Sequence, residues 1–118
     1  MERVLLFVYG TLMCGEAAHE LLGPTARFIG SGRTEPRFTL LDLGEYPALV
    51  DGGETAVAGE LYEIDAALLP ALDRYEDVPE MYQRRSIDVG GHVALAYLLH
   101  AELALGRLGI AAGDWRKR

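Results

Sequence analysis

The stretch VLLFVYGTLMCG, residues 4–15, joins a short apolar run to a glycine-bounded loop. Residues 4–8 are apolar and partly β-branched or aromatic, and a turn signal follows at once, which is typical of a buried strand. The loop has two interpretations. It either turns the chain and buries the apolar residues that follow, or it presents the backbone N–H groups of Gly10, Thr11 and Leu12 to a carboxylate or an oxyanion.

The same loop is not predicted to bind a nucleotide. Gly10 and Gly15 have the spacing of a GxxxxG phosphate loop that follows a strand. Such a loop continues with Lys and then Ser or Thr, which hold the phosphates and Mg²⁺. This chain continues with Glu16 and Ala17, which provide the wrong charge and no hydroxyl.

Length and composition indicate one folded, soluble domain over residues 1–118. The hydrophobic share of 50% and the charged share of 25% match average soluble proteins rather than disordered or membrane classes. A net charge of −7 argues against nucleic acid and against an anionic membrane surface as partners. No apolar run approaches the roughly 20 residues of a membrane span. Arg116, Lys117 and Arg118 are expected to form a solvated tail.

Cysteine and histidine usage predicts neither a disulfide nor a metal site. Cys14 is the single cysteine, and the N-terminus lacks the pattern of a signal peptide, so a cytoplasmic location is expected. Covalent catalysis by Cys14 is not expected, because His19 lies five positions on and off its helical face. His19, His92 and His100 are too scattered for a zinc pattern.

Most of the remaining chain is predicted to form strands. Short β-rich segments are separated by Gly, Pro or acidic turn residues, and they cover residues 26–34, 37–44, 47–51 and 55–64. Residues 82–89 and 92–100 flank Gly90-Gly91, a dipeptide that supplies the positive φ angles of a two-residue hairpin turn. The C-terminal stretch is expected to be coil, tied down by Leu108, Ile110 and Trp115.

Two helices are predicted among these strands. Residues 15–22 have apolar positions at helical spacing before Gly23 and a proline stop them. Residues 64–80 form the clearest helical stretch, with Asp65 as N-cap, and the helix proper is expected to start at Pro70. The predicted fold class is α+β, with about six or seven mostly antiparallel strands in a curved or barrel-like sheet and one or two helices on it.

Glu76 is the first candidate for chemistry, because it follows Leu69 by seven positions and Leu72 by four on the apolar stripe of the predicted helix. A partly desolvated carboxylate has a pKa above the usual value of about 4.3, which suits proton transfer near neutrality. The alternative is that Glu76 turns outward at a frayed helix end or pairs with Arg84 or Arg85. Periodicity leaves both interpretations open.

Other polar side chains are weaker candidates. Asp73, Asp77 and Glu80 lie off the apolar stripe and are expected to be solvated, with Asp73 as a secondary candidate for a base. Hydroxyl groups that could bind a polar ligand belong to Tyr9, Tyr46, Tyr75 and Tyr82. Any single tyrosine is more often a core or rim residue whose hydroxyl is satisfied by the protein.

Several segments together resemble the gamma-glutamylcyclotransferase-like family, in its AIG2-like branch. They are FVYGTLMCG, LGEYPALV, GELYEID, LDRYEDVPEMYQRR and GIAAGDW, which follow one another from residue 7 to residue 115. The resemblance implies a small mixed β-barrel with flanking helices and no cofactor. It also implies a small γ-glutamyl compound as the substrate, while the sequence indicates no oligomeric state.

The resemblance implies a site as well as a fold. Tyr9, Gly10, Thr11 and Leu12 would bind the γ-glutamyl group and Glu76 would act as general acid and base. Tyr46 and Tyr82 are further candidates for substrate binding. The implied reaction closes the γ-glutamyl group to 5-oxoproline and expels the amine or amino acid linked to it. A noncatalytic module that binds a carboxylate or an amino-acid derivative is the alternative.

Overall fold

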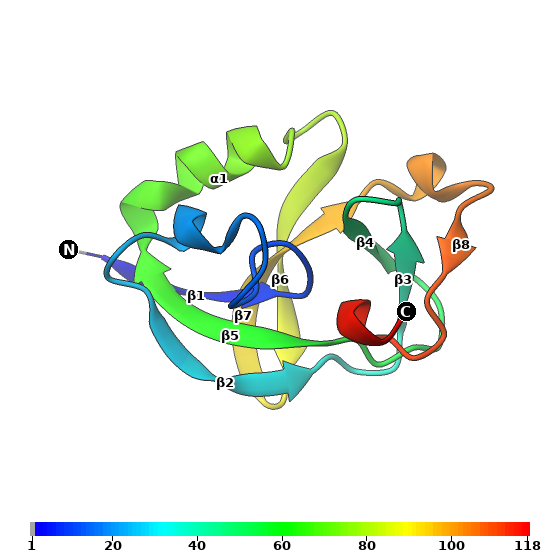
Figure 1. Cartoon of the computed structure of the whole chain (residues 1–118), viewed down its shortest axis with the longest axis horizontal. Helices are drawn as coiled ribbons and strands as arrows, with labels where there is room; N and C mark the ends of the chain where they lie inside the picture. The colour runs from blue at the N-terminus through cyan, green and yellow to red at the C-terminus, as the bar shows by residue number, and fades with distance from the viewer. Residues whose placement is uncertain (1) are drawn as a thin grey trace.

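The computed structural model describes residues 2–118, which form a strongly curved mixed sheet with one α-helix across it (Figure 1). The sheet has eight strands, one more than the upper estimate from the sequence. Their bounds are β1 Arg3–Val8, β2 Arg27–Arg33, β3 Phe38–Asp42, β4 Pro47–Asp51, β5 Ala58–Asp65, β6 Tyr82–Val89, β7 His92–Leu99 and β8 Leu108–Gly109.

Strand β7 holds the sheet together, because it pairs with three other strands. The order is β2-β5-β1-β7-β4-β3-β8, and β6 pairs with β7 as well. The β1–β7 and β4–β7 pairs are parallel, and the other pairs are antiparallel. The predicted mostly antiparallel α+β fold is therefore confirmed.

The β6–β7 hairpin is confirmed at the predicted turn. Its pairs run from Tyr82↔Leu99 to Val89↔His92. Gly90 and Gly91 join the strands with φ angles of 59° and 86°, a region that glycine enters without steric cost.

Helix α1, Leu69–Tyr75, also begins where the proline predicts. A 3₁₀ turn at Ala66–Leu68 precedes it, and the Asp65 carboxylate caps that turn by accepting the N–H of Ala67 at 3.0 Å. Proline stands in the first turn of α1, where its missing N–H costs nothing. Glu76 is the C-cap residue, and its N–H donates to the carbonyl of Leu72.

The helix predicted at residues 15–22 is wrong in its first half. Only His19–Leu22 is helical, as a 3₁₀ turn. Gly15 has a φ of 84°, outside the helical region, and the chain before His19 consists of turns. Apolar spacing alone therefore overestimated the helix.

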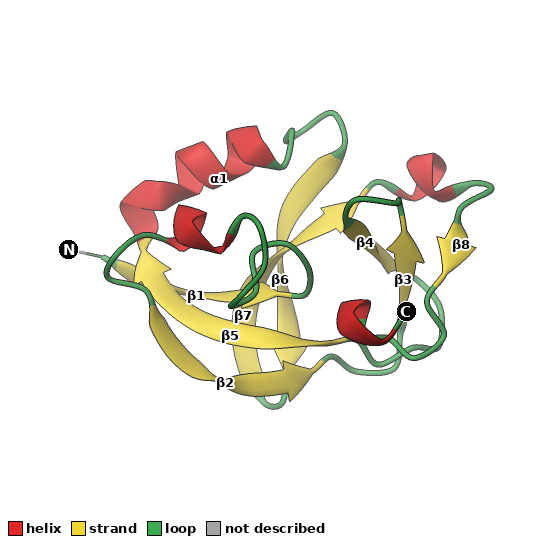
Figure 2. Cartoon of the chain, viewed as in Figure 1, coloured by secondary structure: helices red, strands yellow, loops and turns green. Residues whose placement is uncertain are grey.

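The C-terminal stretch is more ordered than the predicted coil. It contains β8 and a 3₁₀ turn at Trp115–Lys117, which lies beside the β3 end of the sheet (Figure 2). Ile110 and Trp115 are buried as predicted, whereas Leu108 is 77% exposed, so its predicted anchoring role is wrong. None of the helices in residues 2–118 is long and apolar enough to cross a membrane.

Backbone packing in the core is closest at Gly59 on β5. A Cβ built there would lie 2.3 Å from the carbonyl oxygen of Val8 and 2.7 Å from the ring of Phe7. Both neighbours belong to β1, so a larger residue at position 59 would push the two strands apart at the point where β1 leads into the Gly10 loop.

Gly59→Ala is expected to lower the free energy of unfolding by about 1–3 kcal/mol, the usual cost of overpacking. Gly30→Ala on β2 is the matched control, because nothing lies within 4 Å of a Cβ built there. Urea unfolding of both variants measures the difference. Equal stability of the two variants would contradict the packing described for β1 and β5.

Candidate active site

A cavity of about 430 Å³ lies where β1 and β4 meet the C-terminal end of α1. Its lining includes all the residues that the sequence singled out for a site, namely Tyr9, Gly10, Thr11, Leu12, Tyr46, Glu76 and Tyr82. The structure therefore brings Glu76 and the Gly10 loop together across one pocket, although about sixty positions separate them in the chain.

The Glu76 carboxylate has no protein partner in residues 2–118. Arg84 contacts both oxygens of Asp73, at 3.0 and 2.9 Å, and Arg85 pairs with Asp51 at 3.1 Å. Neither arginine therefore pairs with Glu76, which leaves the interpretation in which its carboxylate faces the cavity. Burial raises the pKa of Glu76 to about 7.

Asp73 has a different environment from the one the sequence predicted. Its carboxylate is half-buried and accepts the hydroxyl of Tyr97 at 2.7 Å in addition to the Arg84 guanidinium. The expectation that Asp73 is solvated is therefore wrong, while Asp77 and Glu80 are exposed as predicted. With its oxygens bound by Arg84 and Tyr97, Asp73 is poorly placed to accept a proton from a ligand.

The loop of residues 9–14, named here the cradle loop, fits the first interpretation of its sequence and is compatible with the second. Leu12 and Met13 are buried, so the loop does turn the chain into the core. Within residues 2–118, however, the N–H groups of Gly10, Thr11 and Leu12 donate to no protein acceptor. These three N–H groups are thus available to an anionic or carbonyl oxygen in the pocket.

Gly10 is required by the contact between the cradle loop and β4. A Cβ at this position would lie 2.4 Å and 2.6 Å from the Cγ and Cδ atoms of Pro47. The glycine lets the loop pack directly on the proline ring, which also lines the pocket.

The hydroxyl groups of two buried tyrosines donate their protons to backbone carbonyls. Tyr9 donates to the carbonyl of Tyr97 at 2.7 Å, and Tyr82 donates to the carbonyl of Pro47 at 3.2 Å. Burial, and after it the charge of Glu76, raises the pKa of the Tyr82 hydroxyl, so this group stays protonated. The free lone pair of Tyr82 and the Glu76 carboxylate can therefore both receive a proton donor.

The remaining tyrosines of the pocket are less enclosed. Tyr46 and Tyr75 are 37% and 48% exposed, and the Tyr75 hydroxyl lies 3.2 Å from Oγ1 of Thr11. Tyr97 lines the pocket too, and sequence reasoning did not select it. Its place on an apolar strand gave no signal that separates a pocket residue from a core residue.

No three His, Cys, Asp or Glu side chains within residues 2–118 are grouped so that they could hold a metal ion. The residues that line the pocket include Glu76, Asp77 and Arg74 as well as tyrosines and the cradle loop with its backbone N–H groups. These groups can orient a small zwitterion and move a proton.

The fold is a small curved mixed sheet with one α-helix, and Glu76 and the cradle loop line its pocket together. The family model described as "Gamma-glutamyl cyclotransferase, AIG2-like" matches residues 6–117, and the chain belongs to this family. The resemblance found in the sequence motifs is therefore confirmed.

Two relatives illustrate the similarity. A Vibrio cholerae protein to which gamma-glutamylcyclotransferase activity is ascribed is 41% identical over 97% of this chain and 96% of its own length. The gamma-glutamylaminecyclotransferase of Mus musculus is 40% identical over 71% of this chain and 62% of its own length. The crystal structure of an AIG2-like protein from Mus musculus superposes with a TM-score of 0.81 at 32% identity, over 97% of this chain and 90% of that one.

Glu76→Gln is expected to stabilise the fold in a pH-dependent way. The folded-state pKa of about 7 exceeds the ordinary glutamate value of 4.5, so folding disfavours the ionised form. Below pH 4.5 Glu76 is protonated in both states and does not lower the free energy of unfolding of the wild type. This free energy falls as the pH rises toward 7. At pH 8 the variant is expected to gain up to about 3 kcal/mol in free energy of unfolding, and at pH 4 nothing.

Urea unfolding of both proteins at pH 4 and pH 8 measures this gain. Glu80→Gln serves as the control, because Glu80 is exposed beyond the end of α1. An equal gain for both variants, or a gain that does not depend on pH, would contradict the burial of an unpaired carboxylate at position 76.

Proposed function

We propose that this protein is a gamma-glutamyl cyclotransferase that releases 5-oxoproline from a γ-glutamyl amine or peptide, with Glu76 as general acid and base. The observation that carries the proposal is the unpaired Glu76 carboxylate, whose pKa burial raises to about 7, opposite three free N–H groups of the cradle loop. Membership of the family supports the same reaction.

The polarity of the pocket indicates how the γ-glutamyl group binds. Glu76 and the lone pair of Tyr82 accept hydrogen bonds, so they suit the α-ammonium group of the substrate. The N–H groups of Gly10, Thr11 and Leu12 donate, so they suit an oxygen of the glutamyl unit, either a carboxylate or the γ-carbonyl.

The reaction needs no nucleophile from the protein. Ionised Glu76 takes a proton from the α-ammonium group, and the resulting amine attacks the γ-carbonyl carbon to close a five-membered ring. The bond between that carbon and the leaving nitrogen then breaks, and Glu76 returns its proton to this nitrogen. The ring nitrogen, which still carries two protons after the attack, gives up the second one, and this proton also passes to the leaving nitrogen. The products are 5-oxoproline and the leaving group as an ammonium ion, and Glu76 is ionised again.

Much of the rate in such a reaction comes from orientation. Amine and carbonyl belong to one molecule, and a pocket that holds the folded conformer keeps them within reach of each other. A group with a pKa near 7 can both accept and return a proton at neutral pH without a large free-energy cost in either direction.

The leaving group is the part of the substrate that the proposal leaves broad. The name of the mouse relative points to γ-glutamyl amines, while that of the Vibrio cholerae relative covers γ-glutamyl compounds in general. The panel to be tested therefore contains both γ-glutamyl amines and γ-glutamyl amino acids.

Incubation with this panel, followed by mass spectrometry for 5-oxoproline, tests the proposal. Glu76→Gln is expected to lower kcat by roughly 10²–10⁴-fold, the usual contribution of a general acid or base. For the wild type, kcat/KM is expected to rise with pH up to about 7 and then to level off, because the ionised carboxylate is the active form.

Glu80→Gln is again the matched control and is expected to keep wild-type turnover, because this side chain is exposed and outside the pocket lining. Full activity of Glu76→Gln would remove Glu76 from the mechanism. Binding of γ-glutamyl compounds without turnover by the wild type would instead favour a noncatalytic binding module.

A further inference from the structure

Both ends of the cradle loop are attached to the same residue, Glu60 on β5. Val8, the last residue of β1, is the register partner of Glu60 in the antiparallel pair. At the other end of the loop, the N–H of Cys14 donates to Oε1 of Glu60 at 2.8 Å. The backbone of Glu60 therefore holds one end of the cradle loop, and its carboxylate holds the other end.

The Glu60 carboxylate is itself held by two further groups. The Tyr62 hydroxyl donates to Oε1 at 3.1 Å, and Nη1 of Arg116 lies 3.6 Å from Oε2. The side chain of Glu60 is only 13% exposed, so its position is defined by these partners rather than by solvent.

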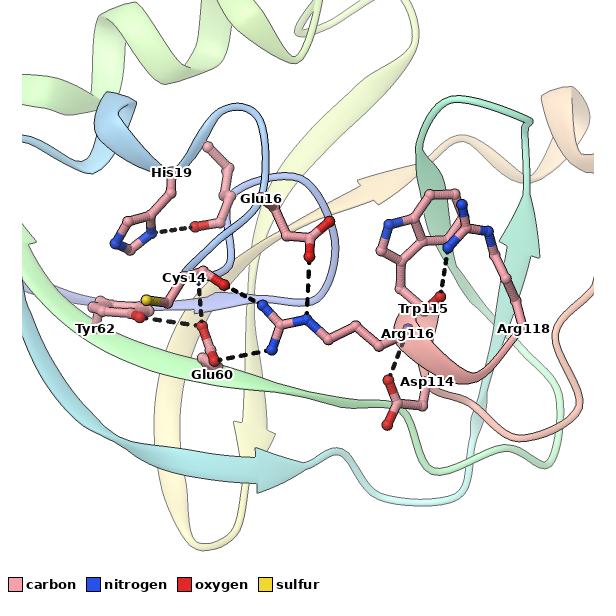
Figure 3. A network of polar contacts seen from close by, with 10 residues as sticks. Cys14, Glu16, His19, Glu60, Tyr62, Asp114, Trp115, Arg116 and Arg118 are labelled. Carbon is pink, nitrogen blue, oxygen red and sulfur yellow. Dashed lines mark hydrogen bonds and ion pairs between the residues drawn. The ribbon is translucent and has the colours of Figure 1, made fainter.

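Arg116 joins the C-terminus to the cradle loop (Figure 3). Besides Glu60, its guanidinium contacts Oε2 of Glu16 at 3.2 Å and donates from Nη2 to the carbonyl of Cys14. Three nitrogens of one planar group thus contact Cys14 in the loop, Glu16 just after it and the Glu60 carboxylate at its base. A lysine has a single nitrogen and cannot reproduce this fork.

The C-terminal turn that carries Arg116 is fixed in turn. Asp114 accepts the N–H of Arg116 at 3.0 Å, and Trp115 is almost fully buried. The Arg118 guanidinium covers the Trp115 ring at 3.5 Å. Arg116 and Arg118 are exposed, as expected of a solvated basic tail, but both also make contacts that attach the tail to the rest of the protein.

We infer that Arg116, acting through Glu60 and Cys14, is a positioning residue that holds the cradle loop in the geometry needed to bind the γ-glutamyl group. This inference rests on the proposed function for its effect on turnover. Its structural basis is that residues 10–18 form turns and bends closed by short-range backbone hydrogen bonds, such as those from Met13 to Gly10 and from Ala18 to Thr11, to which contacts from other segments are added. Arg116 supplies these contacts from a segment 100 positions away from Glu16.

Arg116→Gln is expected to lower kcat/KM by roughly 10- to 100-fold, because a small misplacement of a positioning group has an effect of this order. KM is expected to rise as well, since the same N–H groups bind the substrate before reaction. A partly unfolded preparation would instead lower kcat and leave KM unchanged. Arg116→Lys is expected to recover part of the lost kcat/KM. Lys117→Gln is the adjacent control, and because the Lys117 side chain is exposed, this variant is expected to keep the wild-type kcat/KM.

A double-mutant cycle tests whether Arg116 acts through Glu60. Glu60→Gln keeps an oxygen for the Cys14 N–H but removes the charge that faces Arg116. The double variant Glu60→Gln/Arg116→Gln is expected to lose no more kcat/KM than the less active of the two single variants loses. Additive losses would overturn the coupling between the two residues.

A readout that does not need turnover separates this inference from the proposed function. Backbone ¹⁵N order parameters of Thr11 and Leu12 are expected to fall in Arg116→Gln, from rigid values of about 0.85 toward 0.6, and to stay unchanged in Lys117→Gln. If the wild type releases no 5-oxoproline, the proposed function fails. The order parameters still test whether Arg116 holds the cradle loop in place. Unchanged order parameters, or lower ones with unchanged kcat/KM, would overturn the positioning role.

Discussion

The Tyr9 hydroxyl joins three strands at the point where the sheet opens into a pocket. β7 has only one register pair with β1, Leu6↔Leu95, and one with β4, Leu49↔Leu98. Tyr9 donates to the carbonyl of Tyr97 on β7 and accepts the N–H of Leu49 on β4. A buried side chain thus satisfies backbone groups that a continuous ladder would otherwise pair.

Tyr9, Tyr97 and Glu76 all line the cavity beside this junction. Pro47 begins β4 and packs on Gly10, so the cradle loop and β4 form one wall of the pocket. Glu76 ends α1 at the opposite wall, where no arginine reaches it. An unpaired carboxylate in this place lowers stability at neutral pH, and such a cost is expected where a residue serves a reaction rather than the fold.

Local sequence signals predicted the parts of the structure that depend on neighbouring residues. Gly90-Gly91 fixed the hairpin turn, Pro70 marked the start of α1, and the spacing from Leu72 placed Glu76 on the buried side of the helix. Contacts between distant segments could not be predicted in this way. Arg84 reaches Asp73 because the β6–β7 register places Arg84 opposite Tyr97, and Tyr97 binds the same carboxylate.

The same limit explains the tail and the failed helix. Residues 15–22 have helical spacing, but Gly15 has a φ of 84°, outside the helical region, and Glu16 pairs with the distant Arg116. In the sequence, Arg116 is part of a charged end. Its partners on β5 and in the cradle loop are far away along the chain, so no local signal indicates them. The family motifs predicted which residues line the pocket. The contacts of Glu60 and Arg116 with the cradle loop could be found only from the folded structure.

Glu60 and Glu76 show how one fold assigns different roles to two carboxylates. Glu60 accepts from a backbone N–H and a tyrosine hydroxyl and faces a guanidinium, so its oxygens are bound and its charge is balanced. Glu76 has no such donors within residues 2–118, and burial alone acts on it. Proton transfer needs an oxygen that is free to bind the substrate and a pKa near the working pH. Glu76 meets both conditions, while Glu60 is suited to hold the backbone donors that face Glu76 across the pocket.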